Sequence, residues 1–137
     1  MGRFSVELKL TNYRDIVEAG VGIRSFNQIR QVTIRGVVDT GATRLVIPAS
    51  VVEQLGVAEA GMTQVRYADG RVAIRSLVDD VQVELLGRSA TFRAAVEPAR
   101  TSALIGAIVL EELDFIVDCA SQALRPRDPN QIISEIE

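Results

Sequence analysis

The stretch Val37–Thr43, with the sequence VVDTGAT, places an acid, a hydroxyl and a glycine directly after two β-branched residues. Val37 and Val38 favour a buried strand, so we expect Asp39 to be held rigidly where that strand ends. The glycine two positions later lets the backbone turn close to the carboxylate, and nearby amide and hydroxyl donors stabilise its charged form. A motif this short also occurs in plain turns, so by itself it leaves a structural role open.

The composition excludes most other catalytic chemistries. The 137 residues contain no histidine and one cysteine, Cys119. A Ser-His-Asp triad, a Cys-His pair, a histidine-ligated zinc and a cysteine cluster therefore cannot be built from one copy of the chain. The adjacent acids Asp79 and Asp80 are expected in a solvated loop, because neighbouring side chains on a strand point to opposite faces and would not share a cation. We expect no metal and no cofactor.

Length and charge favour one domain that binds neither nucleic acid nor membrane. We expect a single domain over residues 1–137, with a core at about 30–125, an N-terminal strand and excursion at 1–29 and a tail at 126–137. The net charge is −3 and the arginines are scattered, so no basic stripe for nucleic acid is apparent. The N-terminus lacks a signal-peptide pattern and no apolar run is long enough to cross a bilayer, which predicts a cytoplasmic protein. Cys119 is expected to be a small buried hydrophobe.

Apolar and polar residues alternate along much of the chain, which predicts a β-rich fold. A turn is expected at Gly36, and Asn12–Asn27 reads as an irregular excursion. Pro48 and Gly56 flank a predicted short helix over Ala49–Leu55. A second short helix is expected over Ala107–Leu113. The predicted strands, including two successive hairpins, are Phe4–Leu10, Gln28–Arg35, Thr63–Tyr67, Arg71–Leu77, Val81–Leu86, Ser89–Val96, Phe115–Asp118 and Gln122–Arg125.

Three segments in order resemble the retropepsin-like aspartic proteases, and the likeness is closest to small single-domain bacterial members. The first is Asp-Thr-Gly at Asp39. The second is a hairpin turn at Tyr67–Arg71, in the place of the flap that closes over substrate. The third is the apolar-apolar-Gly motif Leu104–Gly106, which ends 67 residues after Asp39. The resemblance implies a mainly β fold: a closed acid-protease barrel with one or two short helices and one lobe per chain.

The resemblance also implies an aspartic endopeptidase. Hydrolysis by this route needs two carboxylates that share a proton, and the chain has one Asp-Thr-Gly, so the partner would be a second copy of the same chain. The substrate would be a peptide or protein. The implied roles are catalysis by Asp39, loop support by Thr40, Gly41, Ala42 and Thr43, packing behind the loop by Leu104, Ile105 and Gly106, and a substrate-binding flap of Tyr67, Ala68, Asp69, Gly70 and Arg71.

Some positions depart from the family pattern. Ala107 stands where retroviral members carry an arginine that ties the dimer together, and Thr43 where many relatives carry an aspartate that binds substrate backbone. These departures keep an alternative open, a catalytically silent dimerisation or peptide-binding module of the same fold. Tyr67 could cover the substrate or pack on a sheet face. Thr40 is expected to brace the paired loops across the dimer.

Overall fold

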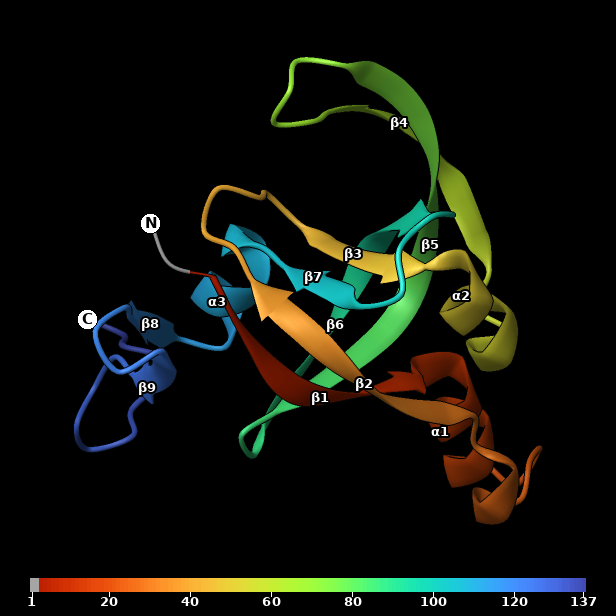
Figure 1. The fold of residues 1–137 in the computed structure, drawn as a ribbon. Helices are drawn as coiled ribbons and strands as arrows, with labels where there is room; N and C mark the ends of the chain where they lie inside the picture. The colour runs from red at the N-terminus through yellow and green to blue at the C-terminus, as the bar shows by residue number, and fades with distance from the viewer. Residues whose placement is uncertain (1–2) are drawn as a thin grey trace.

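Six strands close into a barrel in the computed structural model, which describes residues 3–137 (Figure 1). The strand order is β1-β2-β7-β3-β6-β5, and pairing of β1 with β5 completes the ring. The predicted closed, mainly β fold is confirmed. The strands are β1 (Phe4–Asn12), β2 (Gln31–Val38), β3 (Leu45–Pro48), β4 (Glu59–Arg66), β5 (Val72–Leu85), β6 (Arg88–Glu97), β7 (Ala103–Ile105), β8 (Phe115–Asp118) and β9 (Ala123–Pro126).

The alternating apolar residues of these strands fill the barrel. Leu8 and Leu10 of β1 are almost fully buried, as are Leu45 and Ile47 of β3. Burying each of these side chains contributes roughly 1.5–3 kcal/mol from the loss of water contact. The period-2 pattern therefore specifies which face of each strand points inward.

The two predicted hairpins share one long strand. β5 runs for 14 residues, pairing with β6 in the barrel and with β4 beyond it. The β4–β5 hairpin consequently arches away from the barrel (Figure 1). The prediction of a loop at Asp79 and Asp80 was wrong, since both residues lie inside β5 at a register shift. Asp80 has a φ of 61° there, and Asp79 pairs with Arg93 at 2.8 Å.

The turn predicted at Gly36 was also wrong, because β2 continues through that residue to Val38. A Cβ at Gly36 would lie 2.7 Å from Leu8 Cδ2 and 2.9 Å from Ile105 Cδ1. Glycine is needed at this position so that the side chains of β1 and β7 can close over the strand. The glycine marks a close approach, which sequence alone does not separate from a turn.

Two of the three α-helices in residues 3–137 were predicted. α2 spans Ala49–Leu55 as expected, follows Pro48 and ends at Gly56, whose φ is 65°. α3 spans Ala107–Glu112, one residue shorter than predicted. The helix α1 (Tyr13–Gly20) and the 3₁₀ helix η1 (Phe26–Gln28) fill the stretch that was expected to be irregular.

Buried polar groups stabilise α1, and these were not anticipated. The Asn12 side chain accepts a hydrogen bond from Asp15 N at 3.1 Å and donates to Leu55 O at 2.8 Å. The Asp15 side chain is 1% exposed and pairs with Arg30 Nε at 2.8 Å. Arg30 Nη2 and the Arg30 backbone N–H also donate to it. The hydrogen bond from the Arg30 side chain, opposed by burial, lowers the pKa of Asp15 below its usual 3.8.

Asp15→Asn is expected to lower the free energy of unfolding by about 2 kcal/mol at neutral pH, because a charge-assisted pair is lost while the shape is kept. Since the folded pKa of Asp15 is lowered, its contribution is present above pH 3.8 and disappears as the pH falls through the folded pKa. The difference between variant and wild type should therefore shrink in acid. Urea unfolding at neutral and acidic pH measures this.

The matched control is Asp80→Asn, which removes a surface pair with Arg14 at 3.9 Å. It should change stability by less than about 0.5 kcal/mol. Equal losses from the two substitutions would contradict a special role for Asp15.

The C-terminal segment forms a small sheet beside the barrel. β8 pairs with β9, as predicted, and Cys119 follows β8. The expectation that Cys119 is buried was wrong: it is exposed in the turn between the two strands. Arg88 ties this sheet to the barrel by donating to Leu113 O at 2.8 Å and to Asp114 O at 3.0 Å. Within residues 3–137 no helix has the length and apolar character needed to cross a membrane.

Candidate active site

Asp39 lies immediately after β2, at a point where the backbone is fixed from both sides. Its N–H donates to Ile105 O at 3.1 Å, and its carbonyl oxygen accepts from Ala42 N at 3.1 Å. The side chain is 10% exposed, and its Oδ1 accepts a hydrogen bond from Gly41 N at 3.0 Å. The strand end and the turn thus hold one carboxylate oxygen in a defined orientation.

The start of α3 holds the next part of the loop. Ala107 N donates to Ala42 O and Ile108 N to Thr43 O, both at 2.9 Å. Gly106 has to be glycine, because a Cβ there would lie 2.6 Å from Arg44 O and 2.8 Å from Ala42 O. The segment Leu104–Gly106, which was predicted to pack behind the Asp39 loop, therefore lies against the backbone of that loop. The strand β7 within this segment pairs in parallel with β2.

The second carboxylate oxygen of Asp39 has a partner that the sequence did not indicate. Arg3 Nη2 lies 3.2 Å from Asp39 Oδ2, and the Arg3 side chain is 60% exposed. Arg3 directly precedes β1 and approaches the loop because β1 pairs along β2 as far as Phe4 and Val38. A correct prediction of this antiparallel register from the sequence would have placed Arg3 beside Asp39.

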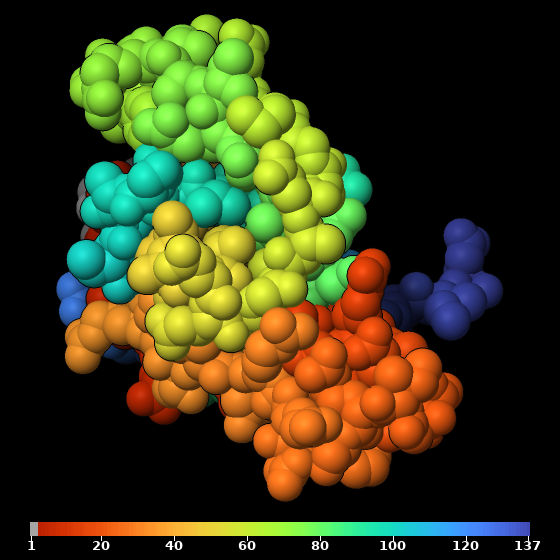
Figure 2. Space-filling view, turned by 90° about the vertical axis from the view of Figure 1, so that its right-hand side faces the viewer, coloured from red at the N-terminus to blue at the C-terminus, as the bar shows by residue number. Residues whose placement is uncertain are grey.

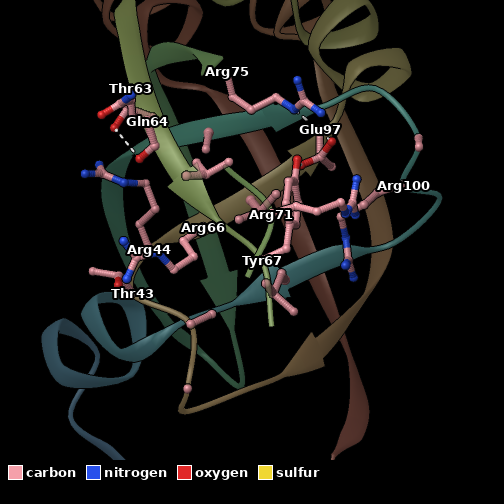
Figure 3. Close-up of a pocket in the computed structure, with 17 residues that line it drawn as sticks. Thr43, Arg44, Thr63, Gln64, Arg66, Tyr67, Arg71, Arg75, Glu97 and Arg100 are labelled. Atoms are coloured by element: carbon pink, nitrogen blue, oxygen red, sulfur yellow. Dashed lines mark hydrogen bonds and ion pairs between the residues drawn. The ribbon is translucent and has the colours of Figure 1, made fainter. Parts of the chain in front are cut away.

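A cleft of about 630 Å³ lies between this loop and the β4–β5 hairpin (Figure 3). In Figure 2 the green hairpin stands above the cyan segment that leads into β7. The cleft is lined by residues of the Asp39 loop, β3, the hairpin, the end of β6, the following loop and β7: Gly41, Ala42, Thr43, Arg44, Val46, Thr63, Gln64, Val65, Arg66, Tyr67, Arg71, Arg75, Ala95, Glu97, Ala99, Arg100 and Leu104.

Six of the predicted site residues line this cleft: Gly41, Ala42, Thr43, Tyr67, Arg71 and Leu104. The others lie around it. Asp39 and Thr40 lie at the start of the loop, Ile105 and Gly106 lie behind it, and Ala68, Asp69 and Gly70 form the exposed hairpin tip. Predicted residues from distant parts of the chain are thus brought to one cleft.

The hairpin tip is a tight turn held by its own hydrogen bonds. Tyr67 N donates to Arg71 O and Gly70 N to Tyr67 O, both at 2.9 Å. Gly70 has a φ of 89°, a conformation that glycine adopts without strain. Asp69 accepts from the Arg71 backbone N–H at 2.9 Å and side chain at 2.8 Å. The Asp-Gly signal therefore predicted this turn for the right physical reason.

A polar contact joins the hairpin to the barrel. Tyr67 Oη donates to Glu97 Oε2 at 2.7 Å, and Arg75 Nε lies 3.0 Å from Glu97 Oε1. The Arg71 guanidinium stacks 4.7 Å from the centre of the Tyr67 ring. The Glu97 carboxylate and burial raise the pKa of Tyr67, so the phenol stays a donor. The sequence did not indicate Glu97, because it becomes a partner of Tyr67 only through the curvature of the hairpin.

Tyr67→Phe should loosen the hairpin, because it removes the Glu97 hydrogen bond and keeps the ring. We expect amide hydrogen exchange in β4 and the start of β5 to accelerate by about three- to tenfold, the equivalent of one lost hydrogen bond. Mass spectrometry of exchanged peptides measures this. The matched control is Tyr13→Phe in α1, which should leave hairpin exchange unchanged. Unchanged exchange in Tyr67→Phe would show that Glu97 does not hold the hairpin.

A six-stranded closed barrel with a carboxylate at a strand end and a hairpin over the adjoining cleft is a retropepsin-like fold. The sequence profile of the family described as aspartyl protease matches residues 26–109. The chain belongs to the aspartyl protease family.

A solved structure titled EIAV protease complexed with the inhibitor HBY-793 is similar in fold. The TM-score is 0.57 with 16% sequence identity, and the match covers 82% of this chain and 88% of that chain. A search of curated proteins found no match. The expected closeness to bacterial members stays a prediction.

Proposed function

We propose that this chain is an aspartic endopeptidase that acts as a homodimer, in which each copy supplies Asp39. The observation that carries the proposal is the fixed Asp39 carboxylate, which accepts the Gly41 N–H at 3.0 Å at the start of a loop that lines the cleft. Membership of the aspartyl protease family supports the same reaction class. One domain over residues 1–137 would form half of the site.

The chemistry requires the second copy. The chain has one Asp-Thr-Gly, and peptide hydrolysis by carboxylates needs a pair that shares one proton. A two-fold axis beside the Asp39 loop would bring two identical carboxylates together, and the interface would be isologous. The Thr40 hydroxyl of each copy would brace the paired loops. Arg3 lies at Asp39 Oδ2 in the single chain, so it has to shift when a second carboxylate approaches that oxygen.

In the assembled pair, one carboxylate is ionised and the other carries the shared proton. The ionised carboxylate takes a proton from water as the water oxygen attacks the scissile carbonyl carbon, and the protonated carboxyl gives its proton to the carbonyl oxygen. The resulting tetrahedral diol then collapses. The peptide nitrogen takes a proton from the carboxyl that water protonated as the C–N bond breaks, and one diol hydroxyl gives its proton to the other carboxylate. This leaves a carboxylic acid, an amine and a carboxyl pair that again holds one proton.

The cleft suits an extended peptide. The loop of Gly41 to Thr43 lines one side, and the hairpin residues from Thr63 to Tyr67 line the other. An extended chain between them would bond its backbone to both sides and place alternate side chains in pockets. The flap role proposed for Tyr67 to Arg71 follows from this position: the Tyr67–Glu97 contact would open to admit substrate and close over it.

Peptide hydrolysis by the wild-type protein and by Asp39→Asn tests this proposal, with sedimentation velocity as the measure of the dimer. Hydrolysis that depends on Asp39 and follows the dimer concentration is the expected result. Hydrolysis that persists in the Asp39→Asn variant would contradict it.

A further inference from the structure

The cleft under the hairpin carries a charge opposite to that of the whole protein. The net charge of the chain is −3, yet the cleft lining holds five arginines and a single acid. These are Arg44, Arg66, Arg71, Arg75 and Arg100, with Glu97 as the acid. Charges of one sign in a cleft with low-dielectric walls concentrate the field and attract ligands of the other sign.

The five arginines differ in how far their charge is neutralised. Arg71 pairs with Asp69 at 2.8 Å, and Arg75 pairs with Glu97 at 3.0 Å. Arg100 donates to the Ser102 carbonyl and hydroxyl oxygens, which carry no charge. Two further arginines, Arg44 and Arg66, form no ion pair with any carboxylate of residues 3–137. Uncompensated positive charge therefore lies at Arg44, Arg66 and Arg100, and of these only Arg100 has its guanidinium engaged by a hydrogen bond within residues 3–137, to Ser102.

Arg44 and Arg66 line the same cleft from opposite walls. Arg44 lies five residues after Asp39, in the loop that leads into β3, and Arg66 is the last residue of β4 in the hairpin. In Figure 3 both are labelled on the side of Thr43, and Glu97 and Arg100 are labelled on the other side. An anionic group between them would be held by the floor and the hairpin at once.

Carboxylate geometry fits this pair. The guanidinium group presents donors in a planar fork that matches two carboxylate oxygens. Two guanidinium groups without a counter-charge in one cleft raise its positive potential, and a bound carboxylate is attracted to both. Arg44 is half-buried, so its interaction with a carboxylate is screened less by water than that of an exposed pair, whereas Arg66 is exposed.

We propose that Arg44 and Arg66 form a subsite for an acidic side chain of the substrate, so that the enzyme prefers peptides with Asp or Glu close to the scissile bond. This inference rests on the proposed function of the same cleft. The subsite lies near the scissile bond because Arg44 belongs to the Asp39 loop. An acidic side chain bound to both Arg44 in the Asp39 loop and Arg66 in the hairpin would also stabilise the closed position of the hairpin.

The test compares peptides that differ only by Glu or Gln at single positions around the cleavage site. Wild type should cleave the best Glu peptide about ten- to a hundredfold faster in kcat/KM than its Gln counterpart, the range expected for charge-assisted hydrogen bonds. The double variant Arg44→Gln/Arg66→Gln should lose this ratio. Arg35→Gln, which removes an exposed arginine of β2 outside the cleft, should keep it.

Charge reversal sharpens the result. The variant Arg44→Glu/Arg66→Glu should favour Lys over Glu at the same position, which a general loss of folding or activity would not produce. The Glu preference of wild type should also weaken as salt rises, because the interaction is electrostatic. A wild-type enzyme with no Glu preference, or a preference that survives both double variants, would overturn the inference.

Binding to the Asp39→Asn variant separates this inference from the proposed function. A fluorescent Glu peptide should bind that variant more tightly than its Gln counterpart, and adding Arg44→Gln/Arg66→Gln should remove the difference. If wild type cleaves nothing while this binding pattern holds, the acidic subsite stands and the protease proposal fails. Equal binding of both peptides to Asp39→Asn would overturn the subsite even if cleavage occurs.

Discussion

Asp39→Asn is expected to reduce peptide hydrolysis by at least about a thousandfold, since the proposed mechanism assigns both base and acid catalysis to this carboxylate. In a homodimer the substitution changes both copies, so neither carboxylate of the pair remains. The fold should persist. Asparagine has the same shape, and its Oδ1 can accept the hydrogen bond that Gly41 N donates to Asp39 Oδ1 at 3.0 Å in the wild type. Hydrolysis of a mixed peptide substrate, followed by mass spectrometry, measures the loss.

A matched control is Asp128→Asn in the C-terminal segment. Its Oδ1 accepts the Asn130 N–H, which asparagine also allows, and it lies outside the cleft lining. This variant should hydrolyse peptides as wild type does. If Asp39→Asn matched that control, the carboxylate could not be catalytic.

A transition-state mimic of the aspartic protease type provides a second measurement. Only an assembled carboxylate pair should bind such a mimic tightly, so it should raise the melting temperature of wild type and not that of Asp39→Asn. A catalytically silent module of the same fold would show no stabilisation in either protein.

Gly106→Ala is expected to lower the free energy of unfolding by about 3 kcal/mol, the upper part of the range for overpacked cores. The new Cβ would meet backbone atoms, 2.6 Å from Arg44 O and 2.8 Å from both Ala42 O and Arg44 N. Backbone cannot rotate away as a side chain can, so the loop from Asp39 to Arg44 has to move. Peptide hydrolysis should fall with stability, because this loop positions the Asp39 carboxylate. Urea unfolding and hydrolysis assays measure both effects.

Substitutions at two other glycines provide a comparison for the loss of stability expected from Gly106→Ala. Gly20→Ala adds a Cβ with no atom within 4 Å, so stability and activity should stay close to wild type. Gly36→Ala would press on Leu8 Cδ2 at 2.7 Å and Ile105 Cδ1 at 2.9 Å, which are flexible side-chain ends, and its cost should lie between the other two. If Gly106→Ala were as mild as Gly20→Ala, the packing behind the Asp39 loop would not constrain its position.

Local signals explain why so much of the fold was predictable. Alternation identified most of the strands but not β3, Asp69-Gly70 identified the hairpin turn, and Pro48 with Gly56 bounded α2 as observed. Each of these signals acts over a few residues and reflects side-chain direction or backbone φ. The errors at Gly36 and at Asp79 and Asp80 share another cause: a glycine or a charged pair resembles a loop unless the neighbouring strands are known.

The residues of the candidate site also fall into those that the sequence indicated and those that only the structure revealed. Asp39 and the apolar-apolar-Gly segment were found by sequence because a strand end and a tight packing contact each need particular residue types. Arg3, Glu97 and the placement of Arg44 and Arg66 in one cleft were not found. Each is an ordinary charged residue in sequence, and its importance comes from the chain segment that faces it.

The sequence by itself determined most of the strand pattern and the position of the Asp39 loop, because these follow from residue types at short spacing, and the second carboxylate stays a prediction. Only the tertiary structure decided that β1 closes the barrel on β5, that α1 is anchored by Asp15, and that the cleft is lined by unneutralised arginines. Those features depend on which distant segments pair, and the energy of an ion pair or a charged cleft exists only after the chain has brought the groups within a few ångströms of one another.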